Sequence, residues 1–388
     1  MRRVYLRHDM IIQRYVIREW LINLLIVTTV LLAVILLIVP FFQFQKYTAL
    51  DEEFIFKVLP YFIPISLVYI IPLSVLLASL FVFGRLSEDN ELLAMKSSGV
   101  SLGRITRPVL YLTVILSIGV VLINTRLIPY CHSQTRQLTI SVFEKRLFSD
   151  SGGADEIKLP DGKITYANYN NGVFESVRLL KFGQRREDLV EELSAQQGKF
   201  EIDKDNAQLS LDLNKVYITR WETSPNARSV GRESASPGKE RTTPHLVKSD
   251  RLIYKMDVST LFAPSRRNLA SLTNSELNEM LLQYKDNPTK TRQVLFSKYQ
   301  RYAGGLTPLI FALIGIPIGV LIRKGSKVAG IGISMLIVFV GYYPLTMFSN
   351  LLGVKKTVIP VMASVWLGNI IIGLAALALV YYIIKNDK

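Results

Sequence analysis

Long apolar blocks are the main feature of the pattern along this chain. Six of them run for at least 18 residues without a Lys, Arg, Asp or Glu. A helix needs ~20 apolar residues to cross the hydrocarbon core of a bilayer. We therefore predict six membrane-spanning helices, which cover Leu21–Gln45, Val58–Gly84, Pro108–Thr125, Tyr302–Ile322, Val328–Val354 and Thr357–Ile384.

Between the third and fourth blocks the pattern changes to an alternation of apolar and polar residues. Asp161-Gly162 and Asn171-Gly172 predict turns between strands. Residues 127–272 are therefore expected to form an all-β domain, an antiparallel sandwich or partial barrel. Three stretches carry this prediction: Lys163–Tyr169, Val173–Leu180 and Gln208–Ile218.

The end of this region carries signals for a loop and for helices. Residues 224–244, rich in Ser, Arg, Gly and Pro, predict a mobile loop. Thr273-Asn-Ser-Glu276 predicts a capping box that opens a helix, and a further helix over 289–301 leads into the fourth span. The predicted layout is an N-terminal membrane half (1–126), the β-domain, and a C-terminal membrane half (273–388).

Composition agrees with a membrane protein, and the distribution of charge predicts its orientation. The 388 residues are 49% hydrophobic and 20% charged, with a mean hydropathy of +0.28 and a formal net charge of +15. This excludes an ordinary soluble enzyme and a disordered nucleic-acid-binding tail. Fourteen Lys and Arg residues flank the spans on one side and four on the other. Since cytoplasmic loops are enriched in basic residues, both termini are expected in the cytoplasm and the β-domain outside.

A short helix is predicted in the cytoplasmic loop after the second span, over about 87–99. Ser87 is a suitable N-cap, the acids that follow it suit the helix dipole, and Gly99 suits the C-terminal stop. Capping and the dipole are enough to explain these residues without a function. The alternative is a docking face for a soluble partner, formed by Glu88, Glu91, Leu92 and Met95.

Basic residues at the span ends on the opposite side also allow two interpretations. Their commonest role is to anchor helices at the membrane interface. Alternatively, they bind the phosphates of a lipid headgroup. The second interpretation gains support because the enrichment of cytoplasmic loops in basic residues does not account for cations on this side. The candidates for headgroup binding are Lys46, Arg126, Arg136, Lys355 and Lys356.

Motifs for enzyme chemistry are absent from the sequence. His8 is expected on the other side of the membrane from His132 and His245, and Cys131 is the only cysteine, so no His or Cys metal site is predicted. There is no Gly-x-Ser-x-Gly elbow and no phosphate-binding loop. The absence of charges inside the spans argues against a proton-coupled transporter. We therefore predict a non-catalytic protein without cofactor or metal, in which any nucleotide hydrolysis belongs to a partner.

Several segments of the sequence resemble those of the LptF/LptG permeases of the lipopolysaccharide-export ABC transporter. The most specific is Gly84–Gly99, GRLSEDNELLAMKSSG, which with Ile71–Ala78 resembles the family's second span and coupling helix. Met10–Glu19 resembles the opening segment, particularly its LptF form. Pro360 and Trp366–Asn369 resemble the start of the last span. The resemblance covers nearly the whole chain.

This resemblance implies an inner-membrane permease subunit with six helices and a periplasmic β-jellyroll. The implied partners are an LptB-type ATPase dimer, a sister permease, an LptC-like periplasmic protein and lipopolysaccharide, and no nucleic acid. Glu91 matches the coupling-helix acid that pairs with the ATPase, and Lys46 lies near the family's basic residues that face lipid A phosphates. The spans Leu21–Gln45 and Val328–Val354 match the lateral gates.

Two functions follow from the sequence. The first is a permease subunit that extracts lipopolysaccharide from the inner membrane and passes it toward the outer membrane. The second is a membrane-anchored scaffold whose β-domain binds a periplasmic partner. A scaffold needs one span rather than six and has no need of a cytoplasmic docking helix, so the permease is favoured.

Overall fold

The computed structural model describes residues 2–46, 52–147, 155–159, 162–170, 173–182, 189–203, 208–222, 243–257, 269–322 and 327–386. The chain divides into two compact units. The helical unit contains Met1–Pro40, Leu59–Ser133 and Asn268–Lys388, and the second unit contains Phe41–Val58 and Gln134–Arg267. The predicted loop over 224–244 and the predicted turns at Asp161-Gly162 and Asn171-Gly172 include residues outside the described parts.

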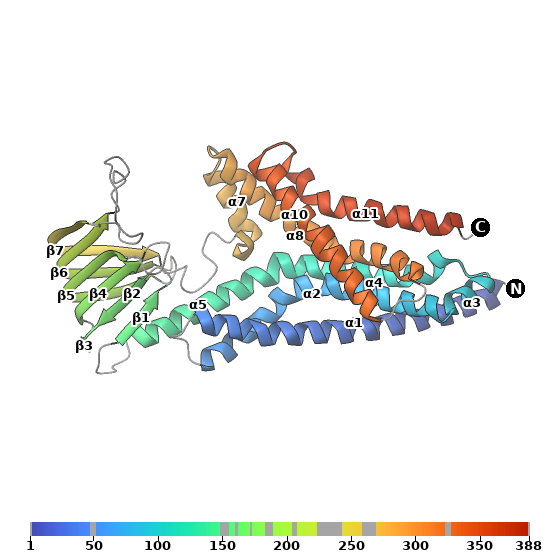
Figure 1. The fold of residues 1–388 in the computed structure, drawn as a ribbon, viewed down its shortest axis with the longest axis horizontal. Coiled ribbons are helices and arrows are strands. Elements are labelled where there is room, and N and C mark those ends of the chain that lie inside the picture. The colour runs from blue at the N-terminus through green and yellow to red at the C-terminus, as the bar shows by residue number, and fades with distance from the viewer. Residues whose placement is uncertain are drawn as a thin grey trace, which may run out of the picture. The chain divides into compact units, whose positions relative to one another are not determined.

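Six helical segments are long and apolar enough to cross a membrane, which confirms the predicted spans. They are α1 (Arg2–Lys46), α2 (Glu52–Glu88), α4 (Leu102–Leu122) continuing through the π-helix η1 (Ile123–Leu127) into α5 (Ile128–Leu147), α8 (Pro288–Leu321), a fifth composite segment, and α11 (Val361–Asn386). The fifth consists of α9 (Lys327–Met335), the π-helix η3 (Leu336–Tyr342), α10 (Tyr343–Asn350) and the π-helix η4 (Leu351–Lys355). Both termini and the short helix α3 (Glu91–Ser97) lie at the same end of the bundle (Figure 1).

The third span differs from its predicted length. Its helix does not end near Thr125 but continues to Leu147, well into the region 127–272 for which β-structure is predicted. Arg126 therefore lies inside a helical segment, in the π-helix η1. A search for apolar blocks does not find the continuing helix, because polar and charged residues interrupt its sequence, IPYCHSQTRQLTISVFEKRL.

The centre of the bundle is formed by α2 and α8. Two thirds of the apolar window of α2 is buried, compared with 6% of that of α1. Close packing of α2 on α8 depends on Gly315 and Gly319, because a Cβ atom at either position would lie 3.1 Å from atoms of α2. Small residues spaced four apart allow this approach of two helix backbones in membranes.

The second unit contains an antiparallel sheet of seven strands, which confirms the predicted β-insertion. The order along the sheet is β1-β2-β4-β5-β6-β7, with β3 paired to β4, so the strands follow one another as a meander. Their bounds are β1 (Asp155–Leu159), β2 (Gly162–Tyr166), β3 (Asn168–Asn170), β4 (Val173–Phe182), β5 (Leu189–Asp203), β6 (Gln208–Glu222) and β7 (Thr243–Asp257). One face carries a buried core that includes Phe174, whose ring stacks on Phe200 at 4.1 Å.

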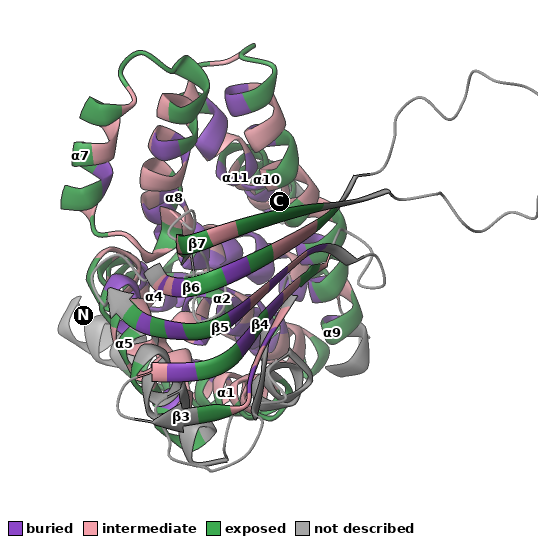
Figure 2. Cartoon of the chain, turned by 90° about the vertical axis from the view of Figure 1, so that its left-hand side faces the viewer, coloured by how far each residue is buried: buried purple, intermediate pink, exposed green. Residues whose placement is uncertain are grey.

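A crease crosses the sheet at one level. The alternation of buried and exposed residues shifts by one position between Phe174 and Val177, between Ala195 and Gly198, and between Leu213 and Val216 (Figure 2). The pairing of neighbouring residues brings the centres of these shifts opposite one another. Two of the central residues, Ser176 and Lys215, have positive φ angles of 52° and 51°. The left-handed residues let β4 and β6 turn their apolar positions back to the same core, whereas the shift in β5 occurs without a residue of positive φ.

After β7 the chain becomes helical again. The 3-10 helix η2 (Leu269–Ser271) is followed by α7 (Asn274–Gln283) and then by α8. The predicted capping box is confirmed: the Thr273 hydroxyl accepts from the Glu276 backbone N–H, and the Glu276 carboxylate accepts from the Thr273 backbone N–H. The predicted helix over 289–301 and the fourth span form the single helix α8.

Candidate functional site

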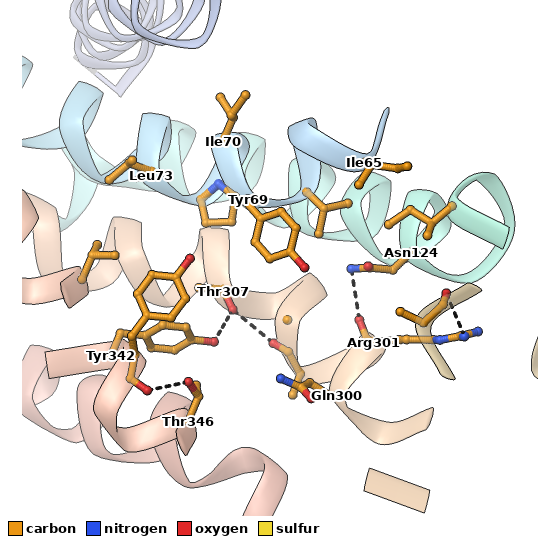
Figure 3. A pocket seen from close by; sticks show the side chains of 18 of the residues that line it. Ile65, Tyr69, Ile70, Leu73, Asn124, Gln300, Arg301, Thr307, Tyr342 and Thr346 are labelled. Carbon is orange, nitrogen blue, oxygen red and sulfur yellow. Dashed lines mark hydrogen bonds between the residues drawn. The ribbon is translucent and has the colours of Figure 1, made fainter. Parts of the chain in front are cut away.

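A cavity of about 590 Å³ lies within the helical unit, and Figure 3 shows the side chains that line it. All six spans contribute to its lining, and the volume is in the range of ligand-binding sites, ~300–1,000 Å³. Its walls differ in chemistry. The side formed by α1 and α2 is mainly apolar and includes Leu31, Ile35, Ile65, Val68, Ile70 and Leu73. The opposite side is mixed and includes Asn124, Gln300, Arg301, Thr307, Tyr342 and Thr346.

The polar side of the cavity holds α8 against the fifth span. The hydroxyls of Thr307 and Tyr342 are 2.8 Å apart and hydrogen-bonded (Figure 3). The Tyr342 ring also meets Phe311 edge to face, with ring centroids 5.1 Å apart. Tyr342 is the last residue of η3, and π-helical turns are frequent at functional sites. The fifth span is thus irregular at the point where it contributes polar side chains.

Arg301 is the buried cation of this cavity and was not among the predicted site residues. Only 6% of its surface is exposed. Its guanidinium donates to the Asn274 side-chain oxygen at 3.1 Å and to backbone carbonyls, including that of Leu269 at 2.8 Å. Within the described residues its hydrogen-bond partners are neutral oxygens, and the Glu276 carboxylate attracts its charge without a hydrogen bond between the two side chains. Such a charge favours an anionic group nearby.

The structure describes the side chains of three of the five predicted headgroup-binding residues. Arg126, Lys355 and Lys356 are exposed, and none of them is part of the cavity lining. Lys46 and Arg136 lie in α1 and α5, but their side chains fall outside what the structure describes. The structure therefore does not test whether these five residues meet, and their role stays a prediction.

The predicted coupling helix is shorter than expected. Instead of starting at Ser87 it comprises Glu91–Ser97, after an Asn90 with a φ of 56° and no side-chain cap. Ser87 belongs to the last turn of α2, where its hydroxyl donates to the Val320 carbonyl at the end of α8, 2.8 Å away. Glu88 ends α2. The C-terminal stop is as predicted, since Gly99 has a φ of 85°.

The apolar part of the predicted docking face needs correction. Leu92 is 4% exposed and packs in the core of the bundle, with Met95 against the same cluster. The Leu92 side chain therefore faces this chain rather than a partner, while Met95 is only partly buried and its part in docking stays a prediction. The exposed apolar residue of α3 is Leu93, at 64%. A helix of two turns cannot bury Leu92 and present it at the same time.

Glu91 lies at the start of α3 and is held by two neighbours. The Tyr15 hydroxyl donates to its carboxylate at 3.0 Å, and the Arg85 guanidinium lies 3.6 Å away. No local pattern signals this arrangement, because Tyr15 and Arg85 come from other helices. Among the described residues, no group of three or more His, Cys, Asp or Glu side chains could hold a metal ion.

Six spans, a β-insertion and a cavity with one apolar and one mixed wall define a polytopic membrane protein. The chain belongs to the lipopolysaccharide export system permease LptF/LptG family, whose family model matches residues 14–382. A search of curated proteins finds no match. The match covers both helical halves and the β-insertion, which confirms the resemblance noted in the sequence. The chain is thus a multi-pass inner-membrane protein and a permease component of a lipopolysaccharide export system.

Proposed function

We propose that this chain forms one half of the membrane path of an ABC transporter that extracts lipopolysaccharide from the inner membrane. A sister permease of the same family supplies the other half, an LptB-type ATPase pair supplies the energy, and an LptC-like protein receives the lipid. The observation that carries the proposal is the cavity, which combines an apolar wall with a wall containing polar groups and the buried Arg301.

The two walls suit the two parts of an amphipathic lipid. Acyl chains gain the hydrophobic free energy of burial against α1 and α2. Sugar hydroxyls and phosphates find hydrogen-bonding groups on α8 and the fifth span, and buried polar groups are costly unless they are so paired. The first and fifth spans, which the family uses as gates, both line the cavity.

The proposed orientation places both termini and α3 in the cytoplasm and the sheet in the periplasm. The location of α3 and the termini at one end of the bundle supports this arrangement (Figure 1). On the cytoplasmic side, Glu91 and Glu88 are the proposed ATPase-facing acids, with Leu93 as the exposed apolar residue beside them. On the opposite side, Lys46, Arg126, Arg136, Lys355 and Lys356 are proposed to bind lipid phosphates.

Site-specific photo-crosslinking tests the proposed path. Phe339 lines the cavity and is 60% exposed, whereas Leu374 on α11 is 61% exposed and is not part of the lining. A benzoylphenylalanine at position 339 is expected to crosslink lipopolysaccharide in living cells, and one at 374 serves as the control. Equal labelling of both positions, or labelling of 374 alone, would contradict a lipid path through the cavity and favour the scaffold.

A further inference from the structure

We propose that Arg85 is a positioning residue that ties the ATPase-facing helix α3 to the first span, so that displacement of α3 moves α1. This inference rests on the proposed function, because it assigns the transmission step of the same transporter. The observation behind it is a cluster of side chains from α1, α2 and α3 around one guanidinium.

Arg85 is the centre of the cluster. Its guanidinium donates to the Tyr15 hydroxyl at 2.8 Å and to the Glu19 carboxylate, both on α1. The same group lies 3.6 Å from the Glu91 carboxylate on α3 and 3.8 Å from that of Asp89. A planar guanidinium can hold several oxygens at fixed angles, which an ammonium group cannot do.

Tyr15 closes the cluster into a ring. Its hydroxyl accepts from Arg85 and donates to Glu91 at 3.0 Å, so α1 contacts α3 directly as well as through α2. The side chains of Glu19 and Glu91 are 21% and 33% exposed. Arg85 is 38% exposed at its side chain and Tyr15 is 40% exposed, so it is the several shared partners that make this arrangement more rigid than an isolated surface ion pair.

Among the described side chains of α1, the buried ones lie at the end of the helix beside α3. Beside Tyr15 and Glu19, the residues Val16, Trp20 and Leu24 are buried in a core that also contains Leu92 of α3. Farther along, the same helix is exposed, with Leu25 at 65% and Leu37 at 77%. The apolar window of α1 is 6% buried as a whole.

The contacts around Arg85 and the buried core hold α1 at the end that lies beside α3, so displacement of α3 tilts α1 from that end. Leu31 and Ile35 on the exposed part of α1 line the cavity, about three to four and a half turns beyond Glu19. Displacement of α3 therefore tilts the wall of the cavity that these two residues form. A basic group of the ATPase that approaches Glu91 also competes with Arg85 for the same carboxylate. The ATPase contact and the position of α1 are thereby linked, as two sites that bias one equilibrium.

The test uses the complete transporter, with ATPase and sister permease, reconstituted in lipopolysaccharide-containing vesicles. Arg85→Gln is expected to keep the ATPase bound and hydrolysing, while lipopolysaccharide released per ATP falls by about fivefold or more, the scale of a typical coupling free energy. Tyr15→Phe, which removes one hydroxyl, is expected to give a smaller loss of the same kind. Arg107→Gln, an exposed arginine of α4, is the matched control and should resemble the wild type.

A distance measurement gives a readout that a merely structural role would not produce. In a Cys131→Ser background, spin labels are placed at Leu37 and Met347, which are 77% and 75% exposed. The distance between them is expected to change on vanadate trapping in the wild type, and the change is expected to shrink in Arg85→Gln. If the Arg85→Gln variant does not assemble into the complete transporter, the same two measurements on Tyr15→Phe test the positioning role.

The outcomes separate the two proposals. A wild-type complex that exports lipopolysaccharide, together with variants that keep the wild-type ratio of export to ATP and the wild-type distance change, would overturn the positioning role alone. A wild-type chain that binds no ATPase and exports no lipopolysaccharide would overturn the proposed function itself.

Discussion

At the scale of residues, single atoms decide how closely the spans approach. Gly304 and Gly305 are neighbours in α8, yet their surroundings differ completely. A Cβ atom at Gly305 would lie 2.2 Å from the Val121 side chain and 3.1 Å from its backbone, whereas nothing lies within 4 Å of one at Gly304. The contact between α4 and α8 therefore depends on one of two adjacent glycines.

We expect Gly305→Ala to destabilise the detergent-solubilised protein by about 1–3 kcal/mol, because the methyl group must push two backbones apart. Gly304→Ala is the control and should be neutral or stabilising, since alanine favours a helix over glycine by about 0.5–1 kcal/mol. Thermal unfolding midpoints of the two variants check this. Similar midpoints for both would show that α4 and α8 are not packed as described.

A second prediction at this scale concerns pH. The Arg251 guanidinium forms two hydrogen bonds with the Asp212 carboxylate, at 2.9 and 2.7 Å, and lowers the pKa of Asp212 below its ordinary value. A lowered pKa in the folded state stabilises the protein above the unfolded pKa, and this contribution is lost as pH falls through the folded pKa.

The expected result is a small difference in unfolding midpoint between the wild type and Asp212→Asn at neutral pH, which disappears at acidic pH. The pair is exposed, so the difference should also decrease in high salt. A difference that grows as the pH is lowered would contradict the assigned ion pair.

Arg301 shows what residue patterns cannot reveal. In the sequence it is one more basic residue at the start of an apolar block, indistinguishable from an interfacial anchor. Its burial follows from the return of η2 and Asn274 across its side chain, and these carbonyl and amide oxygens come from 27 to 32 positions away. Glu91, in contrast, is predicted as a site residue from the sequence around it. Only its partners Tyr15 and Arg85 could not be predicted, because they come from other helices.

At the scale of elements, regular patterns were predictable and their ends were not. The six apolar blocks and the capping box of α7 are local features, and the structure confirms both. The start of α3 depends on a tertiary contact instead. Ser87 has the chemistry of an N-cap, but its hydroxyl is used by the Val320 carbonyl, so α2 continues past it. The crease in the sheet is likewise a property of paired strands rather than of any one strand.

The crease leads to a prediction for Lys215. An L-residue with positive φ costs ~1–2 kcal/mol, a cost that glycine avoids. Lys215→Gly should therefore be as stable as the wild type or more stable, and Lys215→Val should be clearly less stable, because a β-branched residue suits this conformation worst. Unfolding midpoints in urea check the order.

Lys199 on β5 provides the control, since it is exposed and is not among the residues with positive φ. There the order should reverse, with Val more stable than Gly, because β-branched residues favour strands. Comparing Gly with Val at each position cancels the loss of the charge. The same order at both positions would mean that Lys215 is not left-handed.

At the scale of the whole molecule, each part has a feature that fits lipid export. The helical unit holds a cavity with one apolar and one polar wall, and the buried core residues of the first span lie beside α3. The β-unit is a meander with an apolar core on one face. The family match over residues 14–382 shows that these parts belong to one permease. Together they support a subunit that provides a path and a mechanical linkage and relies on a partner for ATP hydrolysis.

The central claim is that this chain is half of an ATP-driven lipid path, and co-purification from its native membrane tests it most directly. Mass spectrometry of the solubilised complex should identify an LptB-like ATPase, a second six-span permease and lipopolysaccharide together. Glu91→Lys should reduce the recovery of the ATPase, because it places a cation where the proposed contact requires an acid. Recovery of a β-domain partner alone, without ATPase or lipid, would contradict the claim and make the chain a scaffold.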